Sequence, residues 1–556
     1  MIAASLEGLD ARPIATAIVG SGPAGLALAL ELARRGLPSV VLESGLEAPG
    51  PAQQLSAAEI VDPRLHDGMD IAVSRRLGGT SNLWGGRCVP LDPIDFEPRE
   101  FAQGARWPIG FGEIAPYYEA ACRWATCGEP IFSAPAPDLG LPDGDFSLTR
   151  VERASNVPAF HKAHAAVLRA SDLIDVRLGA TLVDFPLGAD GAVRRIRVAG
   201  LDGREVEIPV GRLVLAAGGL ETTRLLLAKQ REASYLFGGP EGPLGRHYMG
   251  HIIGEIADIV FRDGRWDAAF EFRQDGRGSF VRRRFTPSEA LQRRKRLPNV
   301  SFWPVVPPIA DARHRSGPLS AVALALSTPG LGARLLPEAI RKRHLDGEID
   351  AWAHVANVAR DLPDTIGFLS RFVHRRYLSS QRVSGYFVPN RAHRYGLSYS
   401  SEQSPRSESR VGLSRETDRL GLPRLRIDYR CHREDAEAIA RAHDELAAWA
   451  ARTGVGRVEY RRPEIAVAEA VVERMGHGTH QIGTARMGAH RREGVVDGDL
   501  RAFDCPNLFV LGSAVFPTSG QANPTLTIVA LAARLADTLA HEGARPVEVT
   551  PAALRA

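Results

Sequence analysis

The strongest constraint on the fold of this chain is a glycine-rich turn between two apolar runs near its amino end, within ATAIVGSGPAGLALALELARRGLPSVVLESG at residues 15–45. A short apolar run, Thr16 to Val19, leads into the pattern GxGxxG. An Ala- and Leu-rich stretch follows, and a second apolar run ends at Glu43. This order predicts a strand, a tight turn, a helix and a second strand, which together form the βαβ unit of an α/β, Rossmann-like domain.

The three glycines and the acidic residue of this unit indicate dinucleotide binding. Gly20 allows the turn, Gly22 lets the backbone approach a pyrophosphate, and Gly25 lets the helix pack closely on the strand. Free N–H groups and the dipole at the helix start favour the phosphate. Glu43 lies 23 residues after Gly20, where an acid binds the ribose hydroxyls. The alternative is a purely structural glycine-rich turn, and the pattern alone does not distinguish NAD from FAD.

Two later segments repeat the order of strand, glycine turn and helix. They are RLVLAAGGLETTRLLLAKQ at residues 212–230 and NLFVLGSAVFPTSGQANPTLTIVALAARLADTL at residues 507–539. In the second, the strand breaks at Gly512, and Asn523-Pro524 opens a long amphipathic helix, with Pro in a tolerated first-turn position. These pieces predict one nucleotide-binding domain built from distant segments. The length of 556 residues also favours two or more domains.

The region between about 256 and 470 carries no nucleotide motif and is expected to form the second domain. The stretches SFWPVV, VSGYFVPN and RLRIDYR are interpreted as strands. Residues 320–376 are interpreted as helical, with Arg and Leu at helical spacing in GARLLPEAIRKRHL and FLSRFVHRRYL. Two surface helices are the simpler interpretation. A basic face that contacts a membrane or a partner is the alternative, and the mixture of Arg, Asp and Glu disfavours a strong form of it.

Composition narrows the class of protein. With 44% hydrophobic and 24% charged residues the chain is typical of globular proteins. A net charge of +4 is too small and too scattered to argue for nucleic-acid binding. The five cysteines form no CxxC pair, so we expect no disulfide framework and no zinc or haem site, but reduced thiols in a cytoplasm. No basic head with an apolar run opens the chain, and no window of about 18 apolar residues appears, so neither a signal peptide nor a membrane span is expected.

Taken together, the motifs of this chain resemble the glucose-methanol-choline (GMC) family of FAD oxidoreductases. The resemblance is carried by GSGPAG with Glu43, GGTSNLWGG, WPIGFGEIAPYYEAA, LAAGGLETTRLLL, GRHYMGH, SESRVGLS, HQIGTARMG and GSAVFPTSGQANPTLTI. These segments run from residue 15 to about 540. The last is most similar to bacterial members that act on sugars and polyols, such as pyranose oxidases, sugar dehydrogenases and amino-sugar 6′-dehydrogenases.

The resemblance implies a discontinuous FAD-binding domain and a substrate domain whose mainly antiparallel sheet roofs the flavin. We place the first at residues 12–255 and 471–545, and the second at 256–470 with a helical insertion at about 320–376. The motif match implies that the following residues line the cofactor: Gly20, Gly22, Pro23, Ala24, Gly25, Glu43, Ser44, Arg76, Gly79, Thr80, Asn82, Trp84, Gly85, Gly86, Ala217, Gly218, Gly512, Ser513, Asn523, Pro524 and Thr525. Covalent members carry a linking histidine where this chain has Leu83. An apolar side chain cannot form that bond, so non-covalent FAD is expected.

Oxidation of an alcohol by a flavin needs a base, because a hydroxyl proton must leave as the hydride moves to flavin N5. Histidine suits this work because its free pKa is about 6.5. The match identifies His480, in GHGTHQIGTARMG, as the base and Asn523 as its partner on the substrate oxygen. The helix after Asn523 would direct its positive end at the flavin. The alternatives are a backbone-bonded His480, a helix N-cap for Asn523, and a metal pair with His477, which no Cys, His or Asp cluster accompanies.

The sequence therefore predicts an FAD-dependent oxidoreductase that acts on an alcohol group of a polar polyhydroxy substrate: a sugar, a glycoside or an amino-sugar. The bacterial resemblance favours a dehydrogenase with a non-oxygen acceptor over an oxidase. Two other functions stay open. One is a lyase or isomerase without net redox, because this fold also hosts hydroxynitrile lyases. The other is a flavoprotein subunit that works only with an electron-transfer partner.

Overall fold

The computed structural model describes residues 1–11, 13–102, 104–135, 139, 144–335, 341, 345, 348–476 and 478–543. Its largest sheet has the strand order β1-β8-β3-β2-β11-β10-β9, and β21 pairs with β11. These strands are β1 (Ile2–Ala3), β2 (Ile14–Val19), β3 (Ser39–Glu43), β8 (Ile174–Leu178), β9 (Thr181–Asp184), β10 (Arg195–Ala199), β11 (Glu205–Leu215) and β21 (Leu508–Val510).

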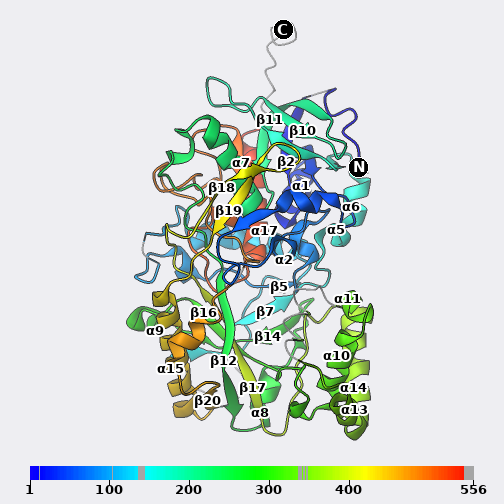
Figure 1. Ribbon diagram of the computed structural model, residues 1–556, viewed down its shortest axis with the longest axis vertical. Helices are drawn as coiled ribbons and strands as arrows, with labels where there is room; N and C mark the ends of the chain where they lie inside the picture. The colour runs from blue at the N-terminus through cyan, green and yellow to red at the C-terminus, as the bar shows by residue number, and fades with distance from the viewer. Residues whose placement is uncertain are drawn as a thin grey trace.

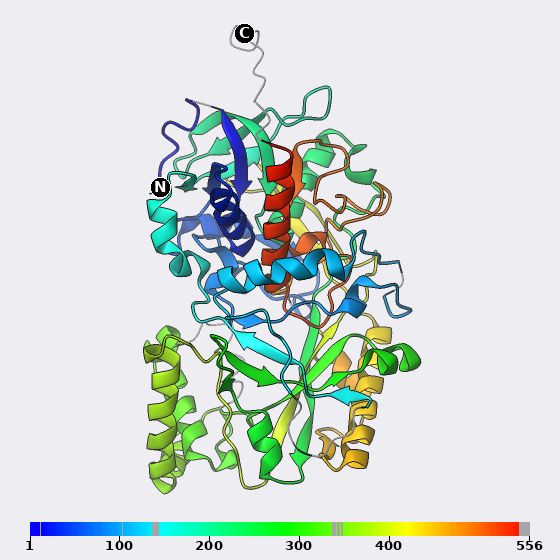
Figure 2. The same ribbon diagram turned by 180° about the vertical axis from the view of Figure 1, so that it is seen from behind.

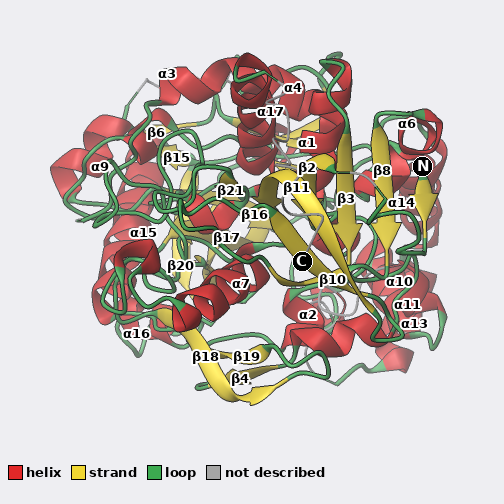
Figure 3. Ribbon diagram, turned by 90° about the horizontal axis from the view of Figure 1, so that it is seen from above, coloured by secondary structure: helices red, strands yellow, loops and turns green. Residues whose placement is uncertain are grey.

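The three predicted strand-turn-helix units meet in this sheet. Strands β2, β11 and β21 are parallel neighbours, although they come from distant parts of the chain. Helix α1 (Pro23–Arg34) follows β2, and α17 (Thr525–His541) follows β21. These two helices pack against each other, and Figure 3 shows them with α4 (Tyr118–Trp124) on one side of the sheet. The predicted α/β domain of discontinuous segments is therefore confirmed.

A four-stranded antiparallel sheet, in the order β16-β17-β12-β20, forms the centre of the lower half in Figure 1. Its strands are β12 (His251–Phe261), β16 (Val300–Val305), β17 (Arg394–Glu402) and β20 (Gly456–Tyr460). Helix α15 (Arg433–Thr453) covers one face, where Phe302 and Tyr399 join a core cluster with Trp449. Because side chains alternate along a strand, neighbours such as Ser301 and Ser400 point to the other face, toward the upper half.

Shorter sheets join segments from the two predicted domains. Strands β5 (Arg87–Cys88) and β7 (Val151–Ala154) continue into β14 (Phe280–Arg283) and β13 (Arg273–Gln274), and β6 (Phe146–Ser147) pairs with β15 (Thr286–Pro287). Strand β4 (Ala58–Ile60) pairs with β19 (Pro423–Asp428), which pairs with β18 (Arg410–Thr417). Further helices are α2 (Met69–Ala72), α3 (Phe111–Ile114), α5 (Phe160–Ala163), α6 (Ala165–Ala170), α7 (Gly219–Glu232), α8 (Gly264–Ala269), α9 (Glu289–Lys295) and α16 (Val467–Val472). The domain limits at 255 and 470 stay a prediction, since strands pair across them.

Two of the three strands expected in the second region are confirmed, as β16 and β19. The expectation for VSGYFVPN, residues 383–390, is wrong because its backbone bonds to the end of a helix instead of a strand. Val383 N donates to Arg375 O at 3.1 Å, and Arg376 Nη1 donates to Val383 O at 2.7 Å. Pro389 also lacks the N–H that a sheet ladder would use.

The predicted helical insertion contains more helices than the two surface helices expected. They are α10 (Gly317–Ser327), α11 (Leu331–Leu335), α13 (Ala351–Arg360), α14 (Leu362–Val373) and the π-helical turn η7 (His374–Leu378). Much of the predicted helix in GARLLPEAIRKRHL, at 336–340 and 342–344, lies outside the described residues. Figure 2 shows α10, α13 and α14 at the outer edge of the lower half. Among the helices described, none is both long and apolar enough to cross a membrane, and all five cysteines are free thiols.

Candidate active site

The carboxyl end of β2 and the amino end of α1 form a backbone cradle. A Cβ on Gly20 would come within 2.6 Å of Ala216 O, and one on Gly25 within 2.0 Å of Gly20 O. A Cβ on Gly22, the N-cap of α1, would meet nothing within 4 Å. Gly20 and Gly25 are therefore required by packing, whereas Gly22 leaves open space at the free N–H groups of the helix, an arrangement that suits a phosphate.

Glu43 closes the cradle at the end of β3. Its buried carboxylate accepts hydrogen bonds from Ser21 N at 3.0 Å, Ser21 Oγ at 2.6 Å and Gly45 N at 2.9 Å. A carboxylate has about four acceptor positions, so a ribose hydroxyl can still donate to it. These residues fit the ADP half of FAD.

The second glycine-rich loop, residues 75–90, lies directly against the first. Gly78 N donates to Ser21 Oγ at 3.2 Å, and a Cβ on Gly79 would be 2.9 Å from Gly22 Cα. Positive φ angles of 88° at Gly78 and 52° at Gly79 turn this backbone toward the cradle. Two side chains expected at the cofactor brace the loop itself: Asn82 Nδ2 donates to Gly79 O at 2.8 Å, and Trp84 Nε1 to Pro158 O at 2.8 Å.

The remaining residues predicted at the cofactor lie at the same edge of the sheet. Because β2, β11 and β21 are parallel, the turns that follow them meet there. The turn residues are Ala217 and Gly218 after β11, Gly512 and Ser513 after β21, Ser44 after β3, and Pro23 and Ala24 in the first turn of α1. Arg76, Thr80, Gly85 and Gly86 belong to the second loop, and Asn523 to Thr525 lead into α17.

Three side chains from distant segments meet beside this edge. His480 follows α16, Asn523 directly precedes the N-cap of α17, and His251 begins β12. Asn523 Nδ2 lies 3.2 Å from His480 Nε2, and His251 Nδ1 lies 2.8 Å from His480 Nδ1. The N-cap of α17 is Pro524, without a side-chain cap bond, so the alternative in which Asn523 caps this helix is wrong. His477 lies outside the described residues.

The burial of His251 determines how this trio holds its protons. Burial lowers the pKa of His251 to about 4, the charge of Arg87 acts in the same direction, and the carbonyls of Ser519 and Gly520 oppose the shift. His251 is therefore neutral near pH 7, with one donor and one acceptor nitrogen. With the Asn523 amide nitrogen directed at His480 Nε2, a neutral His480 would carry its proton on Nδ1 and donate it to His251 Nδ1. This leaves the Nε2 lone pair of His480 as the basic site.

Comparisons with known proteins agree with this geometry. The GMC oxidoreductase family matches residues 405–532, and the FAD binding domain family matches residues 14–64. The chain therefore combines an FAD-binding domain near its amino end with a carboxyl-terminal domain of the GMC oxidoreductase family. It is therefore an FAD-dependent enzyme that acts on alcohol groups.

The chain is similar to three bacterial oxidases. It is 23% identical to paromamine 6′-oxidase of Streptomyces fradiae over 96% of this chain and 92% of the relative. It is 24% identical to 6‴-hydroxyparomomycin C oxidase of Streptomyces lividus over 94% and 90%. The similarity to C-glycoside 3-oxidase of Arthrobacter globiformis, 36% identical, spans only 26% of this chain and 27% of that relative.

Solved structures support the GMC fold alone. The pyridoxine 4-oxidase from Mesorbium loti superposes with a TM-score of 0.51 at 16% identity, over 95% of this chain and 99% of that one. A formate oxidase gives a TM-score of 0.53 at 15% identity, over 95% and 98%. Since each superposition covers nearly the whole chain, it includes both halves of the protein and not one domain alone.

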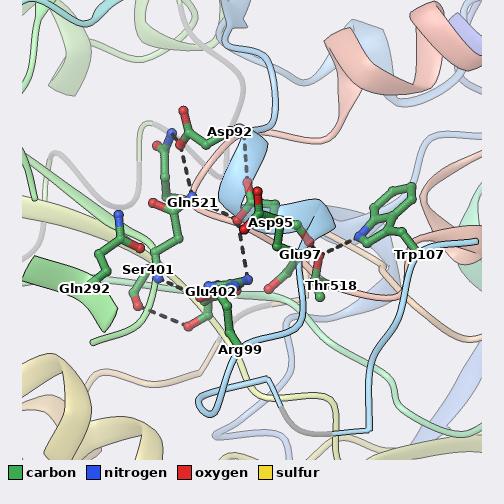
Figure 4. A network of polar contacts seen from close by, with 12 residues as sticks. Asp92, Asp95, Glu97, Arg99, Trp107, Gln292, Ser401, Glu402, Thr518 and Gln521 are labelled. Atoms are coloured by element: carbon green, nitrogen blue, oxygen red, sulfur yellow. Dashed lines mark hydrogen bonds and ion pairs between the residues drawn. The ribbon is translucent and has the colours of Figure 1, made fainter. Parts of the chain in front are cut away.

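The loop that carries Asn523 is fixed by polar contacts to both halves of the protein (Figure 4). Gln521 Nε2 donates to Asp92 Oδ2 at 3.0 Å, while Gln521 Oε1 accepts from Ser301 Oγ at 3.0 Å. Ser400 Oγ donates to Gln521 O at 3.1 Å, and Thr518 Oγ1 donates to Asp95 O at 3.0 Å. Because every one of these groups is buried, the loop holds Asn523 in a defined place.

A carboxylate cluster lies below this loop. Arg99 pairs with Glu402 and lies 3.5 Å from Asp95, and Asn299 Nδ2 donates to both Asp92 and Asp95 at 2.9 Å. Burial raises the pKa of Asp95 to about 7, and Arg99 opposes that shift. The sequence analysis did not identify His251 or the carboxylate cluster as parts of the site. The segment GRHYMGH, which ends at His251, contributed only to the family resemblance. The roles of Asp92 and Asp95 depend on contacts to distant strands.

Proposed function

We propose that this enzyme oxidises an alcohol group of a sugar, a glycoside or an amino-sugar, with His480 as the base. The single observation that carries the proposal is the trio His251–His480–Asn523, in which His480 Nδ1 lies against His251 and His480 Nε2 lies beside a side-chain amide. The substrate class is supported by the relatives matched over nearly their full length, which are named as oxidases of paromamine and of 6‴-hydroxyparomomycin C.

The roles of the residues follow from their atoms. FAD, when bound, supplies the hydride acceptor at its N5. His480 Nε2 takes the hydroxyl proton, and the Asn523 amide donates to the substrate oxygen as negative charge develops on it. His251 holds His480 by accepting from its Nδ1–H, so the imidazole keeps its orientation before and after the proton arrives. The amino end of α17 adds a positive field at this place.

We infer further that FAD is bound without a covalent bond and that the enzyme resides in the cytoplasm. Leu83, at the place of the linking histidine, supports the first, and the five free thiols support the second. Acid precipitation should release the yellow cofactor into the supernatant. Colour that remains in the pellet contradicts non-covalent binding.

The test of the proposed function is anaerobic mixing of the holoenzyme with a panel of sugars, glycosides and amino-sugars. Bleaching of the oxidised flavin band, with identification of the product, supports the proposal. Turnover with an unchanged oxidised spectrum supports a lyase or isomerase instead. Reoxidation by oxygen and by an artificial dye then separates an oxidase, a dehydrogenase and a subunit that needs an electron-transfer partner.

A further inference from the structure

Helices α13 and α14 and the turn η7 expose an apolar stripe that has no partner among the described residues. The stripe consists of Trp352, Val355, Leu362, Ile366, Val373 and Tyr377, with side chains 84%, 46%, 48%, 60%, 44% and 51% exposed. More than half of the large apolar side chains that are exposed in the described part of the chain lie between residues 331 and 378. An exposed apolar patch of this kind marks a site of interaction.

The spacing of the apolar stripe places it on one side of the helices. Trp352 and Val355 of α13 are 3 residues apart, and the members from α14 into η7 are 4, 7 and 4 residues apart, which are steps of one or two helical turns within each helix. The side that packs on the protein is a different one. There His354 Nδ1 lies 2.9 Å from Ser320 Oγ of α10, and Phe368 and Phe372 contact Tyr386. The helices therefore have two apolar sides, of which the residues that the structure describes cover only one.

Charge is distributed unequally along the same segment. Residues 348–364 contain four acids and one arginine, a net charge of −3, whereas residues 365–378 contain three arginines and no acid, a net charge of +3. An anionic membrane surface attracts a uniformly basic face and would repel the acidic half of this one. A second copy of the chain in antiparallel orientation would bring each acidic half against a basic half.

The apolar residues match in the same antiparallel arrangement. Around a point near residue 364, the positions of the apolar stripe are almost symmetric: Trp352 lies opposite Tyr377, Val355 opposite Val373, and Leu362 opposite Ile366. A two-fold interface requires one patch to be complementary to itself in this way. We infer that two copies of this chain associate through α13 and α14, side by side and antiparallel. The helices lie at the outer edge of the lower half in both views (Figures 1 and 2).

Sedimentation of the full-length holoenzyme at micromolar concentration tests the inference. We expect a particle of twice the 60.1 kDa of one chain. The double variant Val355→Glu, Ile366→Glu should sediment as a monomer and keep its FAD content and its rate of flavin reduction, since both side chains are exposed. The matched control, Tyr235→Glu with Val472→Glu, changes two exposed apolar residues elsewhere and should remain a dimer. A monomeric wild type, or a stripe variant that stays dimeric, overturns the inference.

Charge-reversal variants distinguish an antiparallel dimer from other partners that could cover the apolar stripe. Arg371→Glu with Arg375→Glu should weaken the dimer at low salt. Adding Glu348→Arg and Asp364→Arg to the same chain should restore it, because both ends are then reversed and complementary again. A monomeric wild type that sediments with vesicles of phosphatidylcholine and phosphatidylserine would instead identify the stripe as a membrane contact. Failure of restoration in a variant with full FAD content contradicts the antiparallel arrangement.

Discussion

Two polar clusters, one buried and one partly buried, stand side by side where the halves of the molecule meet, and they differ in charge. The catalytic trio extends from His251 at the start of β12, and the carboxylate cluster extends from Glu402 at the end of β17. His251 and Glu402 face each other across the strand ladder, so strands about 4.8 Å apart carry both. The carboxylate cluster contains fixed charges, whereas His251 is kept neutral by burial.

This difference reflects what each cluster must do. A buried charged network fixes geometry because removing one partner leaves the other charge uncompensated. A base that takes a proton must instead begin neutral and have a pKa within reach of the working pH. The loop of residues 518–523 contacts both clusters, since Gln521 donates a hydrogen bond to Asp92 while Asn523 lies against His480. The charged cluster therefore positions the neutral one.

The largest effect is expected from removing the base. His480→Ala should slow anaerobic flavin reduction by about 10²- to 10⁴-fold, roughly 3 to 5.5 kcal/mol of barrier. FAD content should be unchanged, because the phosphate and ribose contacts lie at the cradle of Gly20 to Glu43. His490→Ala, at an exposed histidine near Glu493, is the control. A reduction rate within about threefold of wild type, less than 1 kcal/mol, shows that His480 is not the base.

The sequence predicted the parts of this comparison that are encoded locally. The three strand-turn-helix units are recognisable from the glycines in their turns and from the residues at the starts of their helices. The structure places their strands β2, β11 and β21 together. His480 and Asn523 were identified as candidate catalytic residues from the motifs that carry the family resemblance. His251, Asp92 and Asp95 were missed because their roles arise from the pairing of β12 with β17 and from Gln521, none of which has a local signature. The absence of a strand at 383–390 likewise depends on a contact with η7.

The two clusters should also respond oppositely to pH. Asp95 has a pKa raised from 3.8 to about 7 in the folded state, so its contribution to stability is present below about pH 4 and is lost as pH rises to 7. His251 has a pKa lowered from 6.5 to about 4, so stability falls as pH decreases through that window. At about 1.4 kcal/mol per pKa unit, the effect is roughly 4 kcal/mol for Asp95 and roughly 3 kcal/mol for His251.

Denaturant unfolding between pH 4 and 7 measures both slopes. Relative to wild type, Asp95→Asn should make stability rise more steeply with pH, because the opposing contribution is removed. His251→Asn should make it rise less steeply. Equal slopes in the two variants would mean that the clusters do not differ in protonation as proposed.

Asn523→Ala should produce the next largest loss of rate. Removal of one hydrogen bond to a developing charge costs about 1.5 to 3 kcal/mol, or roughly 10- to 150-fold in flavin reduction. Stability should change little, because Asn523 is not the helix cap. The double variant with His480→Ala should lose less than the sum of the single losses, since both groups act on one substrate oxygen. Full additivity contradicts that shared contact.

The smallest effect, and the one that links the clusters, is expected at His251. His251→Leu removes the acceptor of His480 Nδ1–H, so the neutral base can adopt the wrong tautomer, and we expect flavin reduction to slow about tenfold, near 1.4 kcal/mol. His251→Asn places an amide atom where the imidazole Nδ1 lies and should recover most of the rate. The pH profile of flavin reduction should move in the Leu variant and return in the Asn variant. If both variants lose the same rate at every pH while keeping FAD, His251 serves packing, and the tautomer of His480 is set by Asn523 alone.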